Sequence, residues 1–242
     1  AQGFGCPWDV FPPGLGRNTY CGLCLECVRT CPSDNIAIRV RAFGADLETP
    51  SAHLDEAFKA FVMLGSAMIY AGVLLGPWGV LKNAAFHVGT PAWLMYAGAF
   101  LSTIFLLLPG LFYVAVRIGA GRNGTPGKIK SSFGELATAL IPLGLMFWAA
   151  FSLSFVLTNA SYIVMALSDP LGWGWNLFGG ASIAWQPVVG WLVTPAQTLV
   201  LAGGLLWSGR LAVKNAARQG ISPHPVLAFC LAVTVLMIWL LV

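Results

Sequence analysis

Charged side chains are scarce in this sequence. Only 9% of the 242 residues are Asp, Glu, Lys or Arg, whereas 57% are hydrophobic. A soluble domain carries about 25% charged residues, so this chain has too few polar side chains to cover a surface in water. Its few Lys and Arg residues form no basic stripe among polar loops, which gives nucleic-acid binding no basis. The composition predicts a membrane protein.

Acidic residues almost disappear after residue 56. Seven of the nine lie in residues 1–56, and only Glu135 and Asp169 follow. The chain therefore divides into a polar N-terminal segment, residues 1–55, and a hydrophobic segment, residues 56–242. No charged residue falls near the centre of an apolar stretch, which argues against a pump or antiporter acting alone.

Histidine is also rare. The three histidines, His53, His87 and His224, all fall near the ends of apolar stretches. A b-type haem in a membrane needs axial ligands inside the helix bundle. We therefore expect no haem b.

Five apolar stretches are long enough to cross a bilayer, which takes about 20 helical residues. Pro109, Pro142 and Pro195 fall within them, and membrane helices tolerate such prolines as kinks. The predicted fold class is mainly α, a polytopic membrane protein with about five transmembrane helices. The predicted spans are residues 58–80, 92–116, 135–158, 186–209 and 224–242.

Lys and Arg are distributed unequally between the two sides that five spans define. Lys82 is alone on one side, while the other side holds the N-terminal segment and the other twelve cations. Because cytoplasmic loops carry the excess of Lys and Arg, we expect a cytoplasmic N-terminal segment and a C-terminus on the opposite side of a prokaryotic inner membrane. The twelve are Arg17, Arg29, Arg39, Arg41, Lys59, Arg117, Arg122, Lys128, Lys130, Arg210, Lys214 and Arg218.

The long connection of residues 159–185 is rich in aromatic residues and glycine. It contains Trp173, Trp175, Phe178 and Trp185, with Asp169 as its only charge. Such residues are typical of an interfacial aromatic belt. A docking surface for a partner or a quinone-like molecule is the alternative.

Five of the six cysteines lie within the first 31 residues. Cys21, Cys24, Cys27 and Cys31 follow the pattern C-x2-C-x2-C-x3-C-P, the spacing of bacterial ferredoxins that bind a [4Fe–4S] cluster. Zinc sites use separated C-x2-C pairs, and disulfides do not persist in a reducing cytoplasm. We expect an iron–sulfur cluster here, beside a short strand over residues 34–40, where apolar and polar residues alternate.

The fourth ligand of this cluster is open. In two-cluster ferredoxins the last cysteine of such a run serves the other cluster, so Cys6, which also precedes a proline, is the alternative to Cys31. If Cys6 is the ligand, Cys31 belongs to a second cluster completed by other sequence or by a partner. For that reason we expect Ala1 to lie partway through a longer protein. Cys230, among apolar residues, is expected to have no redox role.

Three stretches of the N-terminal segment resemble the membrane-bound 4Fe–4S binding proteins of the NapH/NosR/CcoG type. They are Cys6-Pro7-Trp8, Arg17-Asn18-Thr19-Tyr20 with the cysteine run that follows it, and Asp34-Asn35-Ile36. The resemblance covers residues 1–47 and none of the five spans. It implies a polyferredoxin attached to transmembrane helices and associated with quinol oxidation, electron delivery to reductases or metal-centre assembly. Members of that group usually carry two cluster motifs, and this chain carries one and a fraction.

The sequence predicts a membrane-anchored electron-transfer subunit of a larger redox complex, without bond chemistry of its own. Its partners would be other membrane redox subunits, a cytoplasmic electron donor or acceptor, and the lipid bilayer. A membrane iron–sulfur protein for assembly or redox sensing is the first alternative, and a structural membrane subunit the second.

Overall fold

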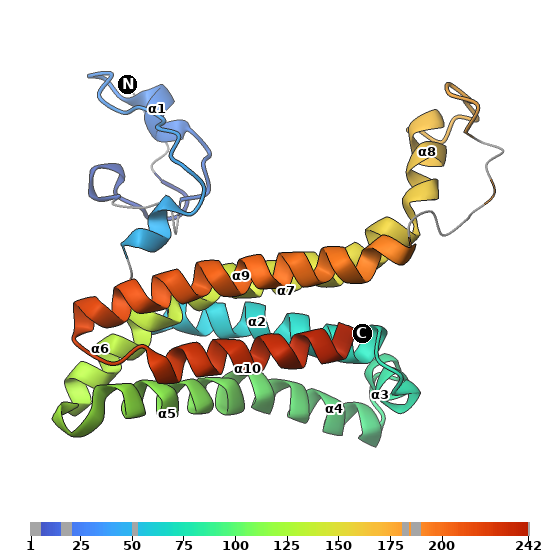
Figure 1. Ribbon diagram of the computed structural model, residues 1–242. Coiled ribbons are helices and arrows are strands. Elements are labelled where there is room, and N and C mark those ends of the chain that lie inside the picture. Colours follow the sequence, from blue (N-terminus) through green and yellow to red (C-terminus); the bar gives the residue numbers. More distant parts are fainter. Residues whose placement is uncertain (1–5, 16–20, 50–52, 181–183, 185–189, 242) are drawn as a thin grey trace. The chain divides into compact units, whose positions relative to one another are not determined.

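The computed structural model describes residues 6–15, 21–49, 53–180, 184 and 190–241. The chain divides into two compact units, Ala1–Thr49 and Pro50–Val242, which we call the head and the bundle (Figure 1). The boundary predicted after residue 55 falls six residues further along the chain, in the first turn of helix α2, Leu54–Leu74.

The head contains little regular structure. Its elements are the 3-10 turn η1, Pro12–Gly14, the short helix α1, Glu26–Thr30, and the 3-10 turn η2, Ala45–Glu48. The strand predicted over residues 34–40 is wrong, because these residues have no regular secondary structure and none of the described residues forms a strand. Alternation of apolar and polar residues gives a strand only where a second strand is available for pairing.

The bundle is mainly helical, as predicted. Five of its described helical segments are long and apolar enough to cross a membrane, so the chain is a multi-pass membrane protein by helix length and composition. The segments are Leu54–Leu74, Pro91–Ala120, Pro126–Thr158, Gly190–Gln219 and His224–Leu241. The helices that form them are α2 (Leu54–Leu74), α4 (Pro91–Ser102) with α5 (Leu108–Ala120), α6 (Pro126–Ala137) with α7 (Leu140–Thr158), α9 (Gly190–Gln219) and α10 (His224–Leu241), while α3 (Gly79–Phe86) and α8 (Ala160–Ser168) are too short to span.

Two prolines interrupt spans in the way their chemistry requires. Pro142 has no N–H to donate to the carbonyl of Thr138. The helix is therefore interrupted between α6 and α7, and the N–H of Ile141 donates to the Thr138 oxygen instead, at 3.2 Å. Before Pro109 the chain passes through one π-helical turn, Thr103–Leu107, which joins α4 to α5, and such turns are a common cause of helix kinks. Pro195 lies inside α9.

The ends of the spans differ from the prediction. The first span starts at Leu54 rather than residue 58, and it ends at Leu74, before Gly76 and Pro77, rather than at residue 80. The fourth span continues to Gln219, ten residues beyond the predicted end. Residues 186–189 and 242 of the predicted spans lie outside the described residues.

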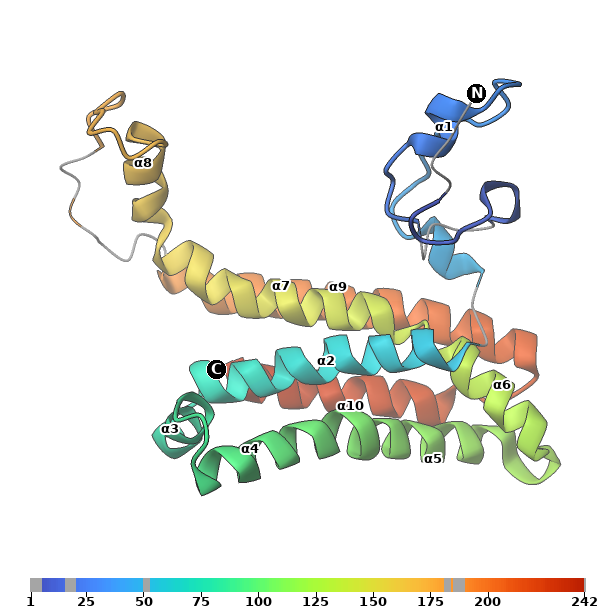
Figure 2. The same cartoon turned by 180° about the vertical axis from the view of Figure 1, so that it is seen from behind.

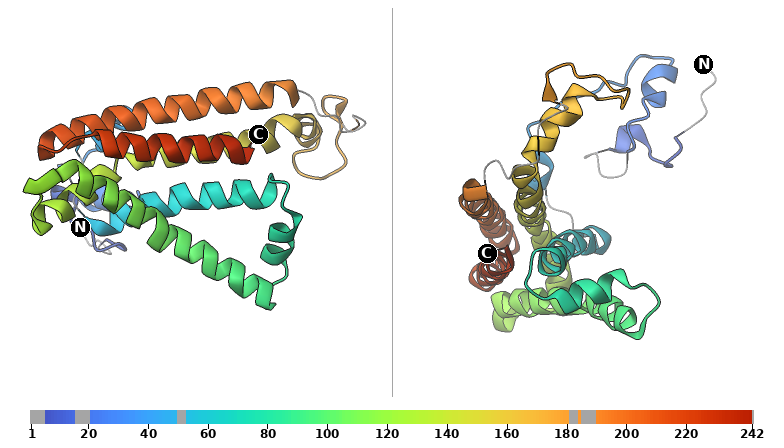
Figure 3. Two further views of the ribbon diagram at one scale, coloured as in Figure 1. Left: turned by 60° about the horizontal axis from the view of Figure 1, so that its bottom comes forward. Right: turned by 90° about the vertical axis from the view of Figure 1, so that its right-hand side faces the viewer.

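Aromatic side chains fill the centre of the bundle. The ring of Phe112 on α5 lies 5.4 Å from Phe61 on α2, 5.5 Å from Phe133 on α6 and 5.3 Å from Phe229 on α10. Phe61 and Phe112 are fully buried. This cluster joins four helices, and the views in Figure 3, one of them nearly along the helix axes, show α2, α5 and α10 lying around a common centre.

Helices α7 and α9 form the most extensive helix pair of the bundle. Gly204 allows their close approach, because a Cβ atom there would lie 2.7 Å from Cβ of Met146, whereas a Cβ on the neighbouring Gly203 would meet nothing within 4 Å. The same open space surrounds Gly98 and Gly110. Of these four glycines, Gly204 is therefore the one that packs inside the chain, as small residues do between membrane helices.

Replacing Gly204 by Leu is expected to weaken α7–α9 packing, because overpacking of this kind costs about 1–3 kcal/mol. Gly203→Leu is the matched control, since it makes the same change in helix propensity at an open position. Reversible unfolding in mixed detergent micelles would measure both variants. Equal stability of the two variants would contradict the proposed packing.

The cations of the bundle gather at one end. The α5–α6 and α9–α10 turns meet there, joined by a 2.9 Å hydrogen bond from the Ser222 N–H to the Gly119 oxygen and a 3.2 Å bond from the Ser132 hydroxyl to Gln219. Figures 1 and 2 show both turns at the end of the bundle opposite to α3, which carries Lys82. The cations at the end with the turns are Lys59, Arg117, Arg122, Lys128, Lys130, Arg210, Lys214 and Arg218.

Candidate metal centre in the head

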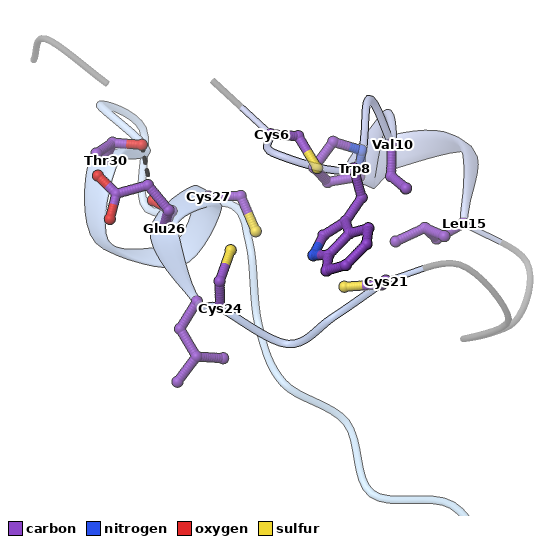
Figure 4. Close-up of a pocket in the computed structure, with 11 residues that line it drawn as sticks. Cys6, Trp8, Val10, Leu15, Cys21, Cys24, Glu26, Cys27 and Thr30 are labelled. Atoms are coloured by element: carbon purple, nitrogen blue, oxygen red, sulfur yellow. Dashed lines mark hydrogen bonds between the residues drawn. The ribbon is translucent and has the colours of Figure 1, made fainter. Parts of the chain in front are cut away.

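Four of the five cysteines of the head line one cavity. Cys6, Cys21, Cys24 and Cys27 surround a space of about 250 Å³ together with apolar side chains that include Val10 and Leu15. Figure 4 shows the sulfur atoms of Cys24 and Cys27 side by side, directed into this space. We call it the thiol cavity.

The backbone between these cysteines is bent so that the thiols face the same way. Leu23 and Leu25 have positive φ angles of 52° and 64°, in the left-handed region that most residues avoid. The N–H of Leu23 points to Sγ of Cys21 at 3.4 Å. An N–H group directed at a cysteine sulfur stabilises negative charge on that sulfur.

Helix α1 positions Cys27. It begins after Leu25, whose carbonyl oxygen accepts the N–H groups of Val28 and Arg29, each at 3.1 Å. The Thr30 hydroxyl donates to the Glu26 carbonyl at 2.8 Å within the same turn. These bonds fix one tight turn, so Cys24 and Cys27 reach the thiol cavity from adjacent positions.

Trp8 forms a wall of the thiol cavity and packs on Gly22. A Cβ atom added to Gly22 would clash with the indole nitrogen of Trp8 and lie 2.9 Å from its Cε2 atom. A larger residue at this position would therefore displace the ring from its place beside Gly22. The contact also holds the segment that carries Cys6 against the cysteine run.

Cys31 lies apart from the thiol cavity. It ends α1, and its Sγ atom accepts the N–H of Asn35 at 3.4 Å. Hydrogen bonds from the backbone N–H groups of Asn35 and then Ser33 lower the pKa of the Cys31 thiol, because they stabilise the thiolate. The thiolate is the form that binds metal, so Cys31 is also suited to be a ligand, but not one facing the other four.

The donor set of the thiol cavity fits a [4Fe–4S] cluster. In the part of the chain that the structure describes, no three His, Cys, Asp or Glu side chains form a group that could hold one metal ion. A cubane cluster makes a different demand, because each of four thiolates binds a separate iron. Four thiols line one small, largely apolar cavity, and an N–H group points at the sulfur of Cys21, so the head offers one thiol for each iron of such a cluster.

The other candidate residues lie away from the thiol cavity along the chain. Cys230 is buried in α10, with its sulfur 3.7 Å from the Ser208 hydroxyl. His53 precedes α2, His87 follows α3 and His224 begins α10. The segment Arg17 to Tyr20, part of the family resemblance, lies outside the described residues.

In the predicted aromatic connection, Asp169 organises the residues after α8. Its carboxylate accepts the backbone N–H groups of Trp173 and Gly174, both at 2.8 Å. The rings of Trp173 and Trp175 meet edge to face, with centroids 5.0 Å apart. This arrangement gives an ordered turn with exposed aromatic side chains. Trp185 lies outside the described residues.

Sequence reasoning missed the role of Trp8 and Gly22. Their contact joins residues fourteen positions apart, and no spacing rule predicts it. A glycine inside C-G-L-C was the one available signal, since a glycine among metal ligands often marks a close approach of another group.

Comparison of the chain with protein-family models, with curated proteins and with solved structures gives no match.

Proposed function

We propose that this protein is a membrane-anchored electron-transfer subunit of a larger redox complex, with one [4Fe–4S] cluster bound in the head by Cys21, Cys24, Cys27 and Cys6. The observation that supports this most directly is the thiol cavity, which these four residues line and Cys31 does not. The four-cysteine spacing supports the same cluster type.

Each part of the head has a physical role in this proposal. The four thiolates would hold the irons, and the N–H of Leu23, already directed at Cys21, would stabilise negative charge on sulfur. Trp8 and the neighbouring apolar side chains would limit the access of water. A bound cluster supplies one-electron transfer: it accepts a single electron from one partner and passes it to another.

The bundle would anchor this centre at a membrane surface. The gathering of cations at one end of the bundle supports a cytoplasmic location for that end. The partners would then be a cytoplasmic electron donor or acceptor and other membrane redox subunits in a prokaryotic inner membrane.

Cys31 would not be a ligand of this cluster. Because its thiol stands outside the thiol cavity, it would be available to a second cluster only where other sequence or a partner chain supplies the remaining ligands, as the last cysteine of such a run does in two-cluster ferredoxins. The chain by itself would then hold one cluster.

Serine variants at the two candidate fourth ligands test this assignment. Cys6→Ser is expected to lose most of the iron of the head cluster, or to change its low-temperature EPR signal, because a hydroxyl is a poor substitute for a thiolate. Cys31→Ser is expected to leave that cluster's signal unchanged. The reverse outcome, with loss on Cys31→Ser alone, would assign Cys31 as the fourth ligand.

A further inference from the structure

A groove runs between α9 and α10 on the outside of the bundle. It has a volume of about 620 Å³, and its apolar lining comes from both helices. Arg210 and Lys214, one helical turn apart on α9, stand along it. The remaining lining residues are Leu205, Leu206, Gly209, Val213, Leu227 and Leu231.

Two leucines of this groove, Leu206 and Leu231, lie outside the packing between the helices, whereas Leu227 lies beside Gly209. On α10, Val226, Phe229 and Cys230 face the interior and are buried, whereas Leu231 is 52% exposed. On α9, Gly204 packs against α7 and the buried Ser208 bonds to the Ala139 oxygen, whereas Leu206 is 64% exposed. The groove therefore presents exposed leucines to the surroundings of a membrane protein, where the neighbours are acyl chains.

Internal hydrogen bonds fix the walls of the groove. The Ser208 hydroxyl donates to the carbonyl of Ala139 on the link between α6 and α7, and the buried amide of Asn215 donates to the Glu135 carbonyl at 3.1 Å. Both bonds hold α9 from its inner face. The outer face, with the groove, is thus a preformed surface.

The groove carries positive charge, and both of its cations lie toward one end of it. Arg210 and Lys214 are exposed and follow the apolar part of α9, at the end of the bundle where the α5–α6 and α9–α10 turns meet. Residues 190–241 contain no Asp or Glu. The groove is therefore apolar along most of its length and cationic toward the end of the bundle where the turns meet.

We propose that this groove binds one anionic phospholipid, with an acyl chain along Leu205, Leu206, Leu227 and Leu231 and the phosphate at Arg210 and Lys214. Basic sites between transmembrane helices on the cytoplasmic side bind such headgroups. This lipid site lies in the bundle alone and does not depend on the metal centre of the head.

Gly209 forms the floor of the groove between the leucines and the cations. A Cβ atom there would make ordinary contact with Leu227, at 3.5 Å. A larger side chain at this position would fill the groove without a backbone clash and without a change in charge. Gly209→Leu therefore separates occupation of the groove from simple attraction to a positive surface.

The test uses the full chain, purified and stripped of lipid in a neutral detergent. Phosphatidylglycerol and phosphatidylcholine are added separately, and native mass spectrometry counts bound lipid while thermal unfolding reports stabilisation. Phosphatidylglycerol is expected to bind at one molecule per chain and to raise the unfolding temperature. Phosphatidylcholine and inorganic phosphate are expected to do neither.

Two sets of variants identify the site. Each cation near a membrane surface contributes about fivefold to binding of anionic lipid, so Arg210→Gln with Lys214→Gln should weaken binding about 30-fold. Gly209→Leu should also abolish the one-to-one complex, while the exchange Arg210→Lys with Lys214→Arg should preserve it. Arg122→Gln, at the same end of the bundle but outside the groove, is the charge control and should bind as the unaltered chain does.

Three results would overturn the proposal. The first is equal binding of phosphatidylglycerol and phosphatidylcholine, which would indicate nonspecific lipid association. The second is unchanged binding in the folded Gly209→Leu variant, which would place the lipid elsewhere. The third is an equal loss in Arg122→Gln and in the double variant, which would mean that overall charge, not the groove, attracts the lipid.

Discussion

Replacing Cys24 by Ala is expected to abolish cluster binding, with the iron content of the purified protein falling from about four per chain to near zero. Cys24 lies within the run and lines the thiol cavity beside Cys27, whereas Cys31, the remaining thiol of the run, lies outside that cavity. Loss of one ligand from a small exposed head also removes binding energy that would help it to fold.

The control for this change is Cys230→Ala, which removes a thiol buried in α10 and should leave the iron content unchanged. Iron analysis and low-temperature EPR of anaerobically purified protein would measure both variants. If Cys24→Ala keeps its full iron content and its reduced signal, the assignment of the cysteine run is wrong.

Replacing Phe112 by Ala is expected to destabilise the bundle by about 3 kcal/mol, the lower part of the range for such truncations. The ring is fully buried and lies within 5.5 Å of three other aromatic rings. Lipid is as apolar as the core, so the loss is one of packing contacts and not of transfer from water.

Phe86→Ala makes the same truncation at a residue that is 64% exposed, and it should change stability by less than about 1 kcal/mol. Unfolding equilibria in mixed micelles would compare the two. Equal effects would mean that the aromatic cluster is not the centre of the bundle.

The five spans could be predicted because their signal is local. A run of about 20 apolar residues needs no knowledge of the rest of the chain, and each predicted span corresponds to one long helical segment of the structure. The sequence predicts that the prolines disturb their helices, but not what shape each disturbance takes. The sequence does not say that Pro142 would separate two helices while Pro109 would follow a π turn, because neighbouring helices decide how a freed carbonyl is accommodated.

The ends of the spans were harder to predict, since polar residues can continue a helix beyond the bilayer. Helix α9 continues past Arg210, the first charged residue of this helix, as far as Gln219. Helix α6 begins nine residues before the predicted span, after Thr125, whose hydroxyl accepts the Lys128 N–H at 3.4 Å. A Thr-Pro pair of this kind is a recognised helix start, and Thr90 begins α4 in the same way, so this boundary could have been found.

At the candidate site, spacing predicts thiol ligands, and the structure places Cys6 rather than Cys31 at the cavity lined by the other three cysteines. The run from Cys21 to Cys31 has the ferredoxin pattern whichever fourth ligand is used. The choice between Cys6 and Cys31 depends on the path of residues 6–15 and on the contact of Trp8 with Gly22, which no local pattern encodes. The strand predicted over residues 34–40 was wrong for a related reason, since pairing requires a second strand.

The most direct test of the proposed function is the iron content per chain of the full protein extracted anaerobically, with low-temperature EPR before and after dithionite. We predict about four irons per chain and the signal of one reduced cubane cluster. About eight irons would indicate a second cluster at Cys31, shared with a partner. Folded, anaerobic protein without iron would contradict the proposal and leave the protein as a membrane scaffold.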